Sequence, residues 1–234
     1  MDWAAPIDAY CERLAPGLFA EPLNAVSNLA FLIAAAYGLV LARRERSDWA
    51  VWALAWLVAI IGVGSLLFHT FANRWSMLAD VIPITVFIYA YFAFALRRFV
   101  GLPWFPTLLL LGALLAANVG LAALTPPDLL NGSIGYLPAL VAALAMALVL
   151  GSRNHEAAFH LTTAAIILAF SLAFRTADRV VCQAVPIGTH FVWHILNALV
   201  LGLYLEAAAR FGARKTHKRT DPGGQASRGS VLKP

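Results

Sequence analysis

Residues 49–71 read WAVWALAWLVAIIGVGSLLFHTF, a stretch that contains no Asp, Glu, Lys or Arg. A helix of about 20 apolar residues crosses the roughly 30 Å of hydrocarbon in a bilayer. This stretch therefore predicts a membrane-spanning helix. Its last two turns carry Ser65 and His69, polar residues that interrupt an otherwise apolar run.

The rest of the chain has the same character. Of its 234 residues, 61% are hydrophobic and only 12% are charged, which excludes a soluble globular domain. We predict an all-α integral membrane protein, a seven-transmembrane helix bundle. The predicted spans are approximately 22–42, 49–71, 78–96, 103–124, 133–151, 157–176 and 186–208.

Short connections between the spans predict one membrane domain over residues 22–211. Residues 1–21 are then an extracytoplasmic N-terminal segment. Residues 212–234 are polar, basic and rich in Gly and Ser, and such a segment cannot bury enough apolar surface to fold. We predict that they form a disordered basic cytoplasmic tail.

Most of the 17 Lys and Arg residues fall on one side of the predicted topology, the side of the C-terminal tail. The positive-inside rule therefore predicts an N-terminus outside and a C-terminus in the cytoplasm. The net charge of +5 arises at helix ends and in the tail, where anionic lipid headgroups are the expected partner. We therefore expect the basic residues to contact the bilayer and not nucleic acid.

The two cysteines, Cys11 and Cys182, both fall on the predicted outer side. Oxidation is permitted there, so the two cysteines could form an intramolecular disulfide or remain as two free thiols. Arg175, Asp178 and Arg179 lie at the outer end of the sixth span, where neighbouring positions on a helix could form a structural ion pair.

Five polar residues lie at similar predicted depth in the membrane. Ser65 and His69 end the second span, Asp80 begins the third, and His190 and His194 fall in the first two turns of the seventh. Ionisable side chains are costly to place within a membrane span, so a cluster of them indicates a functional site. We expect this site near the outer end of the bundle.

The spacing of the histidines is typical of a metal site. His190 and His194 are four residues apart and share one helix face, so His69 from another helix could complete a three-histidine zinc site. Such a site leaves a fourth position for a water, whose pKa the metal lowers to about 7. Asp80 could accept and donate protons, and Ser65 could donate a hydrogen bond to a developing oxyanion.

These residues resemble the alkaline ceramidase family, within a superfamily of seven-helix membrane hydrolases that includes adiponectin and progestin-type receptors. The resemblance spans about residues 8–210 and rests on four blocks: Tyr10-Cys11-Glu12, Glu21-Pro-Leu-Asn24-Ala-Val-Ser27-Asn28, Gly64-Ser65-Leu-Leu-Phe68-His69 followed by Asp80, and His190-Phe-Val-Trp-His194.

The resemblance implies a zinc-dependent hydrolase that cleaves the N-acyl amide of ceramide, or of a related N-acyl lipid, into a sphingoid base and a fatty acid. It implies His69, His190 and His194 as zinc ligands. Ser65 and Asp80 are then the catalytic residues.

Members of this family also bind calcium through an acidic N-terminal segment, with the oxygen ligands that calcium prefers. Glu12 and Glu21 match that motif. Asp8 is offset by one residue, and Leu14 stands where the family has an amide. We therefore predict Asp8, Glu12 and Glu21 as calcium ligands, with the alternative that Glu21 complements the dipole of the first helix.

Two other functions remain open. The chain could be a receptor or signalling protein with a structural zinc. It could also be a metal or proton transporter, but a transport path should continue as polar groups toward the other face, whereas the remaining span interiors are mostly Ala, Leu and Val. We expect a bacterial inner membrane, with the active site toward the outer face.

Overall fold

The computed structural model describes residues 2–15, 17–153 and 155–212. Seven helices within these residues are long and apolar enough to cross a membrane, so the predicted seven-helix membrane protein is confirmed. The bounds are α1 Pro22–Ser27 with α2 Leu29–Arg44, α3 Trp49–Phe71, α4 Arg74–Arg98, α5 Trp104–Leu124, α6 Leu137–Ser152, α7 Ala158–Val181 and α8 His190–Ala207. A 3₁₀ segment, η1 (Leu129–Tyr136), precedes α6, and a π-helical turn, η2 (Ala208–Gly212), follows α8. The predicted tail lies outside the described residues from residue 213 onward.

The ends of three spans differ from the prediction for local reasons. Helix α4 begins at Arg74 because Asn73 and Ser76 form a capping box. The first span is divided at Asn28, whose side-chain amide donates to the carbonyl of Asn24 and competes with the helix backbone. Helix α8 begins at His190, so Pro186 lies in the preceding turn and not in the helix. Asp48 caps the start of α3, since its carboxylate accepts the N–H of Ala50.

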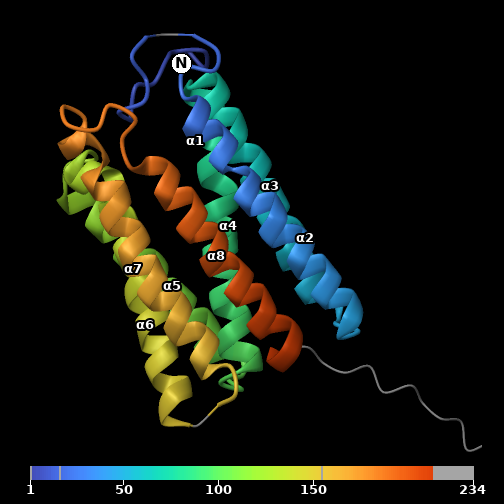
Figure 1. Ribbon diagram of the computed structural model, residues 1–234. Helices are drawn as coiled ribbons and strands as arrows, with labels where there is room; N and C mark the ends of the chain where they lie inside the picture. The colour runs from blue at the N-terminus through green and yellow to red at the C-terminus, as the bar shows by residue number, and fades with distance from the viewer. Residues whose placement is uncertain (1, 16, 154, 213–234) are drawn as a thin grey trace, which may run out of the picture.

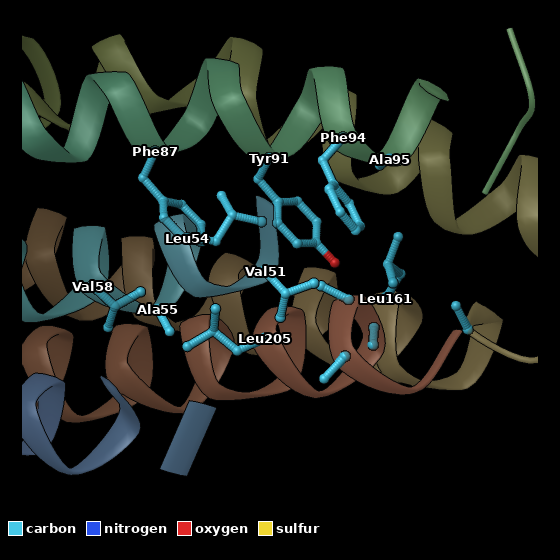
Figure 2. Packing of buried hydrophobic residues seen from close by; sticks show 14 of the residues in the cluster. Val51, Leu54, Ala55, Val58, Phe87, Tyr91, Phe94, Ala95, Leu161 and Leu205 are labelled. Atoms are coloured by element: carbon cyan, nitrogen blue, oxygen red, sulfur yellow. The ribbon is translucent and has the colours of Figure 1, made fainter. Parts of the chain in front are cut away.

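The helices form two groups around α4 and α8 (Figure 1), with α1, α2 and α3 on one side and α5, α6 and α7 on the other. Apolar side chains fill the space where α3, α4 and α8 meet, among them Val58, Tyr91 and Leu205 (Figure 2). Lipid tails are as apolar as leucine, so helix association in a bilayer depends on close packing and small residues.

Gly64 shows this close packing at the level of the predicted site. A Cβ at position 64 would collide with the carbonyl oxygen of Ala79 in α4. Pro83 lacks the N–H that would bond this carbonyl within the helix. The backbones of α3 and α4 therefore approach each other beside Ser65 and Asp80.

The N-terminal segment crosses the end of the bundle where α3 ends and α8 begins (Figure 1). The N–H of Ile7 donates to the carbonyl of Ala72 at 2.8 Å, in the turn between α3 and α4. Cys11 and Cys182 form a disulfide that joins this segment to the end of α7. Of the two possibilities left open by the sequence, the structure shows the disulfide.

Candidate metal centre

Three histidines from two helices meet at this end of the bundle. His69 lies in the last turn of α3, while His190 is the first residue of α8 and His194 lies one turn later. Their exposed fractions are 1, 2 and 1%. One ring nitrogen of each lies within 4.8 Å of the others, which is close enough for the three rings to share a single metal ion. Three buried histidines at this separation could hold a metal and are consistent with zinc.

Two of these rings have nitrogens that no described residue satisfies. Nε2 of His69 and Nδ1 of His190 are buried and have no hydrogen-bond partner among residues 2–15, 17–153 and 155–212. A buried polar atom without a partner costs about 1–3 kcal/mol. A metal ion bound by the three rings would remove this cost, so the residues present fit the implied zinc.

The orientation of His69 is set by a buried carboxylate. Oε2 of Glu21 lies 2.6 Å from Nδ1 of His69, and Oε1 accepts a hydrogen bond from Nε of Arg13 at 2.6 Å. Burial alone would raise the pKa of Glu21, but His69 and Arg13 outweigh it and hold the pKa below its usual range. An ionised carboxylate only accepts, so Nδ1 of His69 carries the proton and Nε2 is free to bind a metal.

His194 is held by a hydroxyl in the same way. Ser27 donates its proton to the carbonyl of Asn24 at 2.8 Å, and its Oγ lies 2.7 Å from Nδ1 of His194. Because the hydroxyl has one proton and has already donated it, it accepts the N–H of His194. Both Glu21 and Ser27 belong to the second sequence block, so this block supplies hydrogen-bond partners for two of the three histidines.

His190 is placed by Asp178, which the metal pattern did not reveal. The buried carboxylate of Asp178 accepts the backbone N–H groups of His190 at 2.9 Å, Thr189 at 2.7 Å and Cys11 at 3.0 Å. It therefore joins α7, the start of α8 and the N-terminal segment. The ring of Tyr10 stacks on that of His190 at 3.6 Å between centroids, and burial raises the pKa of Tyr10.

The predicted ion pair at the end of the sixth span is replaced by other contacts. Asp178 binds backbone N–H groups as described, while Arg175 donates to Asn131 and Ser133 in η1. Its guanidinium lies 5.6 Å from the ring centroid of Trp193, within the range of a cation–π contact. Arg175 thereby ties the loop after α5 to the wall of the site.

Ser65 and Asp80 lie beside each other and line a cavity that also contacts His190 and His194. Oδ1 of Asp80 is buried and has no hydrogen-bond partner in the part of the chain that the structure describes. The structure therefore brings together all five residues of the predicted cluster. The chemical roles of Ser65 and Asp80 stay a prediction.

The predicted calcium ligands are not gathered around one point. Asp8 is exposed, Glu12 accepts the N–H groups of Leu23 and Asn24 at the start of α1, and Glu21 contacts His69. Among the described residues, the three histidines are the only group of three or more His, Cys, Asp or Glu side chains close enough to share a metal. Calcium binding stays a prediction, without support from the structure.

We predict that Glu21→Gln lowers zinc affinity by about 10–100-fold, the usual effect of removing a carboxylate that supports a metal-bound histidine. Zinc titration of the purified apoprotein measures this. Asp8→Asn is the matched control, since this carboxylate is exposed in the same segment. Equal losses in both variants, reversed by added calcium, would instead support the calcium site.

Comparison with known proteins adds an independent finding. The family model described as ceramidase matches residues 7–225, which is most of the chain. No curated protein matches the chain. This match, together with the seven spans, supports a ceramide-hydrolysing membrane enzyme. The chain belongs to the ceramidase family.

Proposed function

We propose that this protein is a zinc-dependent membrane amidase that hydrolyses the N-acyl amide of ceramide, or of a related N-acyl lipid, to a sphingoid base and a free fatty acid. The main support is one observation: two of the three clustered histidines, His190 and His194, line one end of an apolar cavity that Ser65 and Asp80 also line. An N-acyl lipid with a tail in this cavity would have its amide beside the histidines.

The three histidines would hold the zinc through the nitrogens that face one another. A bound zinc ion polarises a carbonyl oxygen and lowers the pKa of a water to about 7. Imidazole ligands suit zinc among the common divalent metals, although other transition metals accept them too. Glu21 and Ser27 keep the rings of His69 and His194 oriented.

We assign proton transfer to Asp80 and charge stabilisation to Ser65. Asp80 accepts a proton from the attacking water and donates it to the amide nitrogen. This protonation is needed because the unprotonated nitrogen is a poor leaving group. The hydroxyl of Ser65 donates a hydrogen bond to the carbonyl oxygen as negative charge develops on it. Oδ1 of Asp80 has no hydrogen-bond partner among the described residues, which supports its role as the acceptor of the proton from the water.

We also propose that the site faces the outside of a bacterial inner membrane. The bias of Lys and Arg supports this orientation, and so does the disulfide at the site end, since disulfides persist in oxidising compartments. A reporter enzyme that requires disulfides, fused at the C-terminus, should remain inactive. An active reporter would show that the C-terminus lies outside and would contradict the proposed orientation.

The function is tested with the full chain purified in detergent. N-acyl sphingoid bases and N-acyl amino lipids are supplied as a panel, and released fatty acid is measured before and after removal of the metal with a chelator. We expect release from at least one ceramide, loss on chelation and recovery with zinc. Retention of one zinc per chain without hydrolysis of any substrate would favour a receptor with a structural zinc.

A further inference from the structure

The cavity beside the histidines extends far along the bundle. It has a volume of about 250 Å³. On α8 its lining runs from His190 to Tyr204, and on α4 from Met77 to Ala95. At 1.5 Å per residue, fourteen helical steps on α8 correspond to a depth of about 21 Å. This is roughly two thirds of the hydrocarbon thickness of a bilayer.

The cavity is narrow for its depth. Pockets for drug-sized ligands have volumes of about 300–1,000 Å³, and a lipid with two tails is larger than such ligands. A volume of about 250 Å³ spread over this depth suits one unbranched hydrocarbon tail. The second tail of an N-acyl sphingoid lipid must then remain outside the cavity, in the bilayer.

Two stacked tyrosines lie near the end away from the histidines, where Ala95 and Leu161 also line the cavity. The rings of Tyr91 and Tyr204 are 4.4 Å apart between centroids, and both line the cavity. The hydroxyl of Tyr91 donates to the backbone carbonyl of Tyr204 at 3.1 Å, which holds the two helices together here. Phe94 stacks on Tyr91 from outside the cavity lining. Figure 2 shows Tyr91 extending from α4 toward α8, next to Phe94.

From this arrangement we propose that Tyr91 and Tyr204 form the floor of the cavity and set the length of the single hydrocarbon tail that it accepts. This inference rests on the proposed function for its substrate, an N-acyl lipid. A tail longer than the distance from the histidines to the floor must bend or displace the aromatic pair. The floor is therefore a determinant of chain-length specificity.

Tyr204→Ala tests the floor because it removes one ring and retains the backbone carbonyl that accepts the hydrogen bond of Tyr91. Two substrate series are compared: one varies the acyl chain with a fixed base, and the other varies the base with a fixed acyl chain. In each series we take the shortest tail that is too long for the native protein and the tail that the native protein prefers. In one of the two series, Tyr204→Ala should raise the ratio of their kcat/KM values about tenfold. One or two methylenes in an apolar pocket change selectivity by about 10–200-fold.

Tyr204→Phe keeps the ring and should retain the native length preference. Leu199→Ala removes a large side chain from the exposed face of the same helix and should also leave the preference unchanged. The series that responds identifies the tail in the cavity. A Tyr204→Ala variant that folds with the native preference in both series, or that shifts equally in both, would overturn the proposal.

A binding measurement separates this proposal from the proposed function. Thermal stabilisation of each variant is recorded with saturated fatty acids and with sphingoid bases of increasing length, because ligands that bind the folded state raise its stability whether or not catalysis occurs. The length that stabilises most should increase in Tyr204→Ala for one ligand class. If the ligand length that stabilises most is unchanged for both ligand classes, Tyr91 and Tyr204 do not limit the tail. This conclusion would hold even if no variant hydrolysed ceramide.

Discussion

Asp80→Asn should lower kcat for fatty-acid release by roughly 10²–10⁴-fold while zinc remains bound, the range expected for loss of a general acid–base. Asn has nearly the same size as Asp but cannot exchange a proton at neutral pH. Asp80 is not one of the three side chains whose ligand atoms lie together, so the metal should be retained. Turnover of the best ceramide and the zinc content of the same purified sample are the two measurements.

His190→Ala provides the contrasting result, because it removes one of three ligands and should lose both zinc and turnover. His160→Ala is the matched control. His160 lies in α7, 3.7 Å from Glu206 in α8, away from the three-histidine group. Loss of zinc from Asp80→Asn would indicate that Asp80 is part of the metal site. Unchanged turnover with full zinc content would show that Asp80 does not take part in the reaction.

Asp178→Ala should be the most destabilising single substitution that the site offers. The carboxylate is 0% exposed and accepts three backbone N–H groups. Each donor left buried without a partner costs about 1–3 kcal/mol, and costs of neighbouring groups add incompletely, so we expect a loss of about 3–5 kcal/mol. Denaturant or thermal unfolding in detergent measures it, and zinc affinity should fall with the displaced start of α8.

Two neighbouring variants make this result specific. Asp178→Asn keeps one carbonyl acceptor and should lose less stability than the alanine variant. Arg179→Ala changes an exposed residue on the same helix and should remain within about 0.5 kcal/mol of the native protein. A melting temperature of Asp178→Ala equal to that of Arg179→Ala would show that the carboxylate does not anchor the three segments.

The spans were predictable because hydrophobic length is a local property. Residues 49–71 required a membrane helix whatever their neighbours, and α3 has those bounds. The relation of His190 to His194 was also predictable, since positions four apart share a helix face. Helix ends were less so: the start of α8 depends on the acceptor that Asp178 brings from α7, which no neighbouring residue in the sequence indicates.

The partners of the histidines show a similar division. Glu21 and Ser27 belong to one sequence block, but the resemblance implies Glu21 as a calcium ligand and indicates no contact with a histidine. Its contact with His69 joins residues 48 positions apart, and that of Ser27 with His194 joins residues 167 apart. Such pairings depend on how the helices pack, because packing decides which polar groups are buried together in a low dielectric and must pair with each other.

The sequence by itself determined the seven-helix class and the five polar residues that meet at one end of the bundle, because length, charge and helical period are local. Only the tertiary structure decided which atoms meet. It placed the carboxylate of Glu21 against the ring of His69, made Asp178 the acceptor for the start of α8 and stacked Tyr91 on Tyr204 in the cavity lining. These contacts join residues far apart in the chain, and their geometry depends on the packing of small residues such as Gly64 between helices.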